Sequence, residues 1–145
     1  MHRVLVGILC CVVASLSSCS VVPDVVVMKD VDVNDWHEAV TLEFDNNTEQ
    51  ICDLNIMLHI NSRFDAQQIA LQIKMFSPDS LFHTEQVSLP SSVKWSKPTA
   101  SSTDMEIPYR RNVSLRHKGK YIFEITPLED ISGVEAAGIN FQANK

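Results

Sequence analysis

The stretch Leu54-Asn55-Ile56-Met57-Leu58-His59-Ile60 indicates the fold class, because its branched apolar residues recur at every second position. A period of two places these side chains on one face of a β-strand and leaves the intervening residues on the other. The same alternation recurs along the chain. The further runs are 40–44, 69–75, 81–89, 113–116, 121–125 and 137–141.

Short clusters of turn-forming residues separate these runs. They are Asp45 to Asn47, Asn61 to Arg63, Ser77 to Ser80, Pro90 to Ser92, His117 to Gly119 and Asp130 to Gly133. No capped helical period of useful length is visible. About seven to nine short strands at this spacing predict an all-β fold, a single antiparallel β-sandwich. Residues 91–108, rich in Ser, Lys and Pro, are expected to form a long loop or irregular crossover.

The N-terminal residues read as a lipoprotein signal peptide. Arg3 is followed by the apolar run Val4 to Ala14, which is too short to span a bilayer about 30 Å thick. Leu16-Ser17-Ser18-Cys19 then matches a bacterial lipobox, in which the cysteine thiol accepts the lipid. We therefore expect residues 1–18 to be a cleaved signal peptide, 19–24 a short lipidated tether and 25–145 the β-sandwich domain. The alternative is an ordinary secretory signal with a chance cysteine.

Charge and cysteine content limit the function classes. Removing residues 1–18 leaves 11 basic against 18 acidic residues, a formal charge of −7. Such an acidic body argues against nucleic acid or an anionic membrane surface as the partner. Two acyl chains would still hold it on a membrane. The remaining thiol, Cys52, begins an apolar alternation and is expected to be buried and inert.

Motifs that carry chemistry are sparse. The four histidines of the mature chain show no metal-ligand spacing, so no metal or cofactor is predicted, although a histidine–carboxylate site assembled across strands stays open. Asp30 to Asp35 resembles the start of a calcium loop, but Asp35 and Thr41 stand where that loop needs Gly and Glu. A polar strand edge leading into Trp36 is the favoured interpretation. Without a nucleophile elbow or phosphate-binding loop, we predict a non-enzymatic protein.

Four aromatic residues fall at or near predicted loops: Trp36, Phe64, Trp95 and Tyr109. Such rings either stack on sugars and anchor protein partners or plug the open ends of the sandwich. Plugging is favoured for Trp36, and the two interpretations are balanced for Trp95. Trp95, Phe64 and Tyr109 are the candidate partner-binding residues.

The order of these features resembles the GldH family, gliding-motility-associated lipoproteins of the Bacteroidetes. The resemblance rests on five groups of residues, which together span nearly all the mature chain. They are Trp36 with Val40 to Phe44; Leu54 to Phe64; Leu71 to Asp79; Trp95; and Gly119 to Ile125 with Gly133-Val134 and Ala137 to Ile139. The chain departs from the family after Trp95, with Ser96-Lys97-Pro98, and again at Pro127-Leu128-Glu129.

The resemblance implies a place beside the gliding and type IX secretion apparatus, at the periplasmic face of the outer membrane. The phylum's surface-export tag is an acidic segment after the lipidated cysteine, which Ser20 to Asp24 does not supply. Asp79-Ser80-Leu81 is similar to the phylum's O-glycosylation motif, which makes Ser80 a candidate acceptor.

These observations predict a lipid-anchored β-sandwich that binds other envelope proteins. The alternative is a carbohydrate-binding lipoprotein of a glycan-uptake system, which would need surface exposure and an aromatic platform. A hydrolase would need clustered histidine and carboxylate side chains in a pocket.

Overall fold

A computed structural model of the chain describes residues 24–93 and 100–144, and within them the fold is all-β, without helices. No segment in these ranges is a helix capable of crossing a membrane. The sandwich consists of eight strands. They are β1 (Val25–Asp30), β2 (Val40–Asn46), β3 (Gln50–Asn61), β4 (Gln68–Phe76), β5 (Phe82–Pro90), β6 (Ser102–Leu115), β7 (Gly119–Pro127) and β8 (Val134–Ala143).

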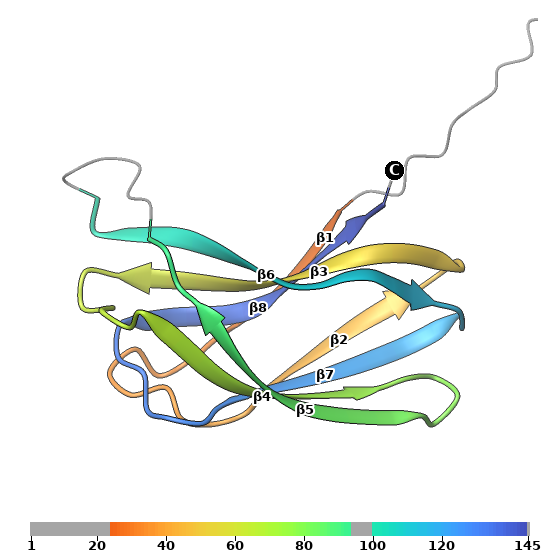
Figure 1. Cartoon of the computed structure of the whole chain (residues 1–145), viewed down its shortest axis with the longest axis horizontal. Helices are drawn as coiled ribbons and strands as arrows, with labels where there is room; N and C mark the ends of the chain where they lie inside the picture. The colour runs from red at the N-terminus through yellow and green to blue at the C-terminus, as the bar shows by residue number, and fades with distance from the viewer. Residues whose placement is uncertain (1–23, 94–99, 145) are drawn as a thin grey trace, which may run out of the picture.

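The strands form two antiparallel sheets of four that face each other (Figure 1). The first sheet has the order β1-β8-β3-β6 and the second the order β2-β7-β4-β5. Only the β4–β5 connection is a hairpin within one sheet, and each of the other connections crosses from one sheet to the other. The predicted antiparallel β-sandwich is therefore confirmed.

The core lies between the sheets and is built from the alternation seen in the sequence. Leu54, Ile56, Leu58 and Ile60 of β3 are all at most 2% exposed, which places the predicted apolar phase inward. Phe141 of β8 stacks on Phe44 of β2 at 4.0 Å between ring centroids and thus joins the two sheets. Burial of these side chains supplies the main stabilisation of a domain that has no internal disulfide among its described residues.

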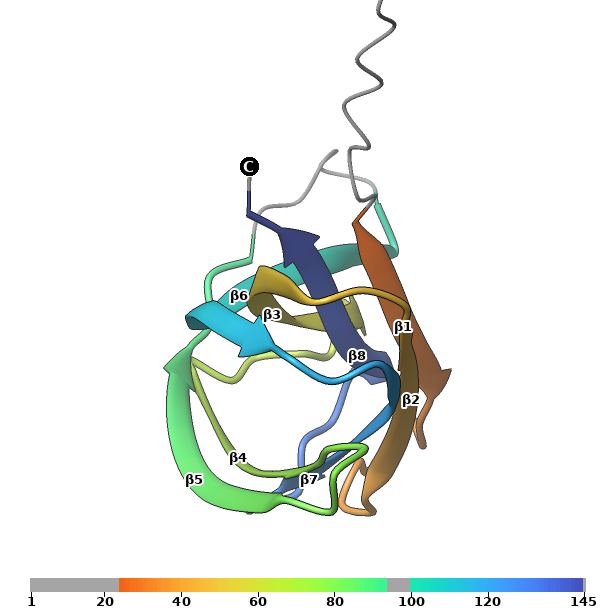
Figure 2. The same ribbon diagram turned by 90° about the vertical axis from the view of Figure 1, so that its right-hand side faces the viewer.

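The two ends of the sandwich are used as reference points below. The proximal end contains the start of β1 at Val25 and the turns 47–49, 77–81 and 116–118. The distal end contains the connections 31–39, 62–67 and 128–133. Figure 2 looks onto the proximal end, which is on the right in Figure 1.

One predicted boundary is wrong. Residues 91–108 were expected to form a loop, but β6 begins at Ser102 and pairs with β3 from Asn61↔Ser102 onward. Pro108 obscured the strand, because proline removes a donor from a β-ladder. It is tolerated here because β6 is an edge strand, paired on one side only. The structure also adds β1, whose Val25 to Met28 run shows no alternation in the sequence.

Candidate functional site

Acidic side chains gather at the distal end. Nine of the chain's 18 acidic residues lie at this end. Among the described residues, the only Lys or Arg side chains at this end are Lys29 and Arg63. The nine are Asp30, Asp32, Asp35, Glu38, Asp65, Asp104, Glu129, Asp130 and Glu135. This end therefore presents a negative surface to cationic groups of a partner.

Trp36 closes the distal end and holds its two loops together. Its indole is 1% exposed, and its backbone exchanges hydrogen bonds with Ile131, N to O at 2.9 Å in one direction and 3.2 Å in the other. The indole Nε1 donates to the Glu38 carbonyl at 2.9 Å. Trp36 thus plugs the sandwich, as the sequence indicated, and fixes the loop 31–39 against 128–133.

A pocket of about 280 Å³ opens along the loop that Trp36 anchors. Polar groups from Asp30, Asp32, Asp35 and His37 line it together with the apolar wall of Val31, Trp36, Ala39 and Val40. The pocket belongs to the segment that resembled the start of a calcium loop. That segment is a connection between β1 and β2 rather than an EF-hand loop.

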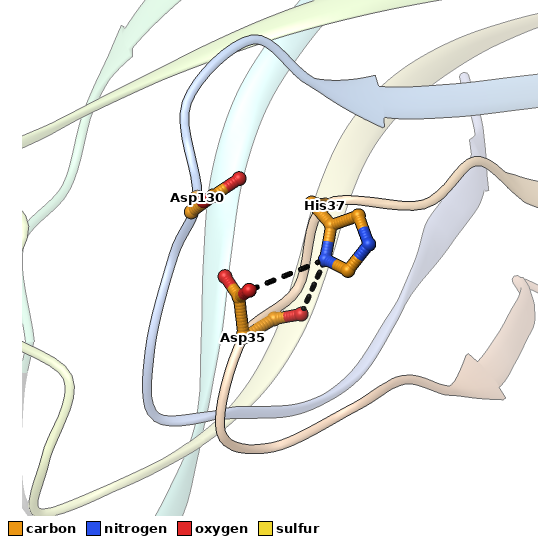
Figure 3. Close-up of side chains that lie close together, drawn as sticks. All are labelled: Asp35, His37 and Asp130. Carbon is orange, nitrogen blue, oxygen red and sulfur yellow. Dashed lines mark hydrogen bonds and ion pairs between the residues drawn. The ribbon is translucent and has the colours of Figure 1, made fainter.

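Asp35, His37 and Asp130 converge beside this pocket, with their ligand-type atoms within 4.8 Å of one another. Figure 3 shows Asp35 and His37 on one loop and Asp130 on the loop that faces it. His37 Nδ1 lies 3.0 Å from the backbone oxygen of Asp35 and 3.4 Å from its Oδ2. Because a carbonyl oxygen can only accept, Nδ1 carries a proton in this arrangement.

The surroundings of His37 favour its charged form. The hydrogen bond to the Asp35 carbonyl is the largest cause and raises the pKa of His37; burial opposes it, and the negative charges of Asp35, Asp130 and Glu38 add to the rise. One imidazole and two carboxylates are also a donor set that divalent metals accept. A metal at Nδ1 would have to displace the proton and break this hydrogen bond, so the cluster fits an ion-paired imidazolium better.

A second histidine–carboxylate cluster ties three strands of the first sheet together near the distal end. His59 of β3 places Nδ1 2.6 Å from Asp104 of β6 and Nε2 3.3 Å from Glu135 of β8. This is the cross-strand arrangement that the sequence left open. All three side chains are at least 36% exposed, so water screens the pairing and its contribution to stability is small.

The predicted contact residues have different fates. Phe64 is 7% exposed and belongs to the core, so we withdraw it as a surface contact residue. Tyr109 is half-buried and donates its hydroxyl hydrogen bond to Glu85. Trp95 and Cys19 lie outside the described residues. Ser80 is exposed in the 77–81 turn with a φ of 66°, and its role as a glycosylation acceptor stays a prediction.

Tyr109 lines a small apolar pocket between β5 and β6, at the edges of the two sheets. The pocket holds about 120 Å³ and reaches the core side chains Leu54, Ile73 and Phe123. Glu85 of β5 also lines the pocket and pairs with Arg110 as well as Tyr109. Burial alone would raise the pKa of Glu85, but the hydrogen bonds from Arg110 and Tyr109 outweigh it and leave that pKa lowered.

The sequence reasoning missed Asp35, His37 and Asp130 as a group. Asp35 and His37 are two positions apart on the loop between β1 and β2. Asp130 lies far away in the sequence, on the connection between β7 and β8. The acidic run from Asp30 to Asp35 was the local signal that this loop carries charge. Nothing local connects it to Asp130.

Comparison with known proteins finds no matching family model, no similar curated protein and no similar solved structure. The resemblance to the GldH family therefore stays a prediction.

Proposed function

We propose that the chain is a non-enzymatic outer-membrane lipoprotein that binds other envelope proteins, as an accessory of the gliding motility and type IX secretion apparatus. The lipid on Cys19 would hold the domain at the periplasmic face of the membrane. Confinement to that surface raises its effective concentration near its partners.

The observation that carries the proposal is the placement of the acidic distal end. The tether enters the sandwich at Val25, and the loops 31–39, 62–67 and 128–133 lie at the opposite end. A domain held by its proximal end presents these loops away from the bilayer. Their exposed carboxylates suit basic partner surfaces, because complementary charge accelerates encounter and selects partners.

The side chains at this end also suit binding rather than catalysis. His37 is paired with Asp35, and His59 with Asp104 and Glu135, so each imidazole already has a carboxylate partner in its own chain. Among the described aromatic residues, only Phe76 and Phe82 are exposed, and both lie near the proximal end. A sugar-stacking platform at the distal end therefore gains no support from the described residues.

Crosslinking in native cells followed by mass spectrometry tests the proposal. A Glu38→Lys, Glu129→Lys double variant reverses two exposed charges at the distal end, and we expect it to lose the crosslinked envelope proteins. Asp45→Lys, Glu49→Lys is the matched control, since it makes the same charge change near the proximal end. Recovery of no stable protein neighbour, or equal recovery with both double variants, would contradict the proposal.

A further inference from the structure

The proximal end exposes a group of large apolar side chains at the β4–β5 hairpin. Leu81 is 66% exposed, Phe82 54% and Phe76 37%, and the two phenylalanine rings lie 4.9 Å apart. We call Phe76, Leu81 and Phe82 the hairpin patch. Single exposed apolar residues are ordinary, whereas a contiguous group of this kind indicates a surface that contacts protein or lipid.

The patch occupies the corner where the outer face of the second sheet meets the proximal end. Phe76 and Phe82 are cross-strand partners, so they share a face of that sheet. Leu81 sits at the tip, where its carbonyl accepts a hydrogen bond from the Ser77 amide at 3.0 Å. The hairpin is thus a fixed projection that holds the three side chains together.

Basic residues border the patch on the adjoining 116–118 turn. His117 Nε2 lies 3.2 Å from Asp79 Oδ2, which places this turn directly beside the hairpin. Arg116 and Lys118 are exposed and make no ion pair with another described residue. Asp45 near the end of β2 and Glu49 on the following turn offset these two positive charges, so this end carries little net charge, in contrast to the acidic distal end.

The described part of the chain begins at the same end, with Asp24 and Val25. Cys19 precedes Val25 by six residues, which span about 20 Å when fully extended. Sheets about 10 Å apart and strands about 4.8 Å apart put the hairpin patch roughly 20 Å from Val25, across the proximal end. A lipid on Cys19 and the hairpin patch can therefore touch one bilayer surface at the same time.

We propose that the proximal end docks on the phospholipid surface, with the hairpin patch at the boundary between headgroups and acyl chains. Arg116 and Lys118 then face lipid phosphates. This inference rests on the proposed lipid anchor and adds an orientation to it, with the distal loops directed away from the membrane. The contact is led by apolar burial, as in other interfacial segments, and does not require anionic lipid.

Brominated-lipid quenching tests the orientation. The acylated protein carries an environment-sensitive fluorophore on Leu81→Cys and is reconstituted into phosphatidylcholine vesicles with brominated acyl chains. Leu128→Cys is the matched control, because Leu128 is 45% exposed at the distal end. We expect severalfold stronger quenching at position 81 than at position 128. A Phe76→Ser, Phe82→Ser change should reduce quenching at position 81.

Equal quenching at the two positions would overturn the docking proposal. The proposal would also be overturned by a spectral change at position 81 that increases with protein density but does not depend on the brominated lipid. Such a result would show that the patch contacts a second copy of the chain. The intact mass of the same preparation separates the two hypotheses. If no acyl mass is found, the proposed lipid anchor is rejected. Quenching at position 81 with excess added vesicles then still decides whether the proximal end docks on the membrane.

Discussion

Gly133 shows how one residue closes the distal end. Its φ is +81°, a region that favours glycine, and a Cβ there would lie 2.3 Å from the Phe64 amide nitrogen. Its amide also donates to the Val33 carbonyl at 3.0 Å. The absence of a side chain is therefore what allows the loops around residues 33, 64 and 133 to meet.

Replacing Gly133 with alanine should destabilise the domain by roughly 2–4 kcal/mol, because the strained φ and the backbone clash add together. Denaturant unfolding measures this change. Ser132→Ala, an exposed change on the same turn, is the control and should alter stability by less than about 0.5 kcal/mol. Equal stability of the two variants would contradict this account of the loop.

The buried thiol of Cys52 makes the stability of the domain depend on pH in the alkaline range. Burial, and then the charge of Asp53, raises the pKa of the thiol to about 11. An unfolded cysteine ionises near pH 8.5, so between the two values the unfolded state loses its proton first. The stabilisation is therefore complete below about pH 8.5 and is lost as the pH rises towards 11.

The unfolding free energy of the protein should accordingly fall more steeply from pH 9 to 11 than that of Cys52→Ala. Denaturation at a series of pH values provides the measurement, and the difference between the two curves isolates the thiol from the lysines that titrate in the same range. Parallel curves would show that Cys52 is not buried as described.

Aromatic residues show what sequence reasoning can assign at this scale. Trp36 was expected to plug the sandwich and does so, because a large ring beside an apolar strand start usually enters the core. Phe64 was a candidate contact residue because it falls near a predicted loop. The turn Asn61 to Arg63 instead folds its ring inward, with the Phe64 amide donating to the Asn61 carbonyl at 3.1 Å.

At the scale of elements, the alternation of apolar and polar residues predicted the strands that bury one face, but it missed the first half of the edge strand β6. β2, β3, β4 and β7 combine a regular period with branched or aromatic residues, and their positions agree with the prediction. The first half of β6 carries only Met105 and Ile107 inward and includes Pro108, so its period is weak. An edge strand with one neighbour tolerates this pattern, and the sequence does not reveal which strand is an edge.

The contact between β5 and β6 depends on one carboxylate. Glu85 receives hydrogen bonds from Tyr109 and Arg110 where few other residues join the two sheet edges. Glu85→Gln should lower stability by about 1–2 kcal/mol, since charge-assisted hydrogen bonds to a largely buried group are lost. Thr84→Ser, an exposed change on the same strand, is the matched control for denaturant unfolding.

The same variant has a second readout. Burial and then the Glu85 carboxylate raise the pKa of Tyr109, so Glu85→Gln should bring that pKa down while leaving it above its usual value. Titration of the phenolate absorbance follows it. An unchanged titration would mean that Glu85 does not hold the tyrosine.

The whole molecule has two unlike ends. Composition predicted an acidic domain, and the order of the strands then determines where the charged residues lie. The connections 31–39, 62–67 and 128–133 meet at one end, whereas the hairpin patch lies at the other. The sequence alone does not show this polarity, because the residues of each end are distributed along the chain. The proposed anchor and partner surfaces are consequences of that arrangement.

The central claim is that an acylated cysteine holds this two-ended sandwich on a membrane. The intact mass of the protein purified from its native host tests it most directly. The account predicts a chain that begins at Cys19 and carries the added mass of a diacylglycerol. A protein of unmodified mass that diffuses freely after cell lysis would contradict it.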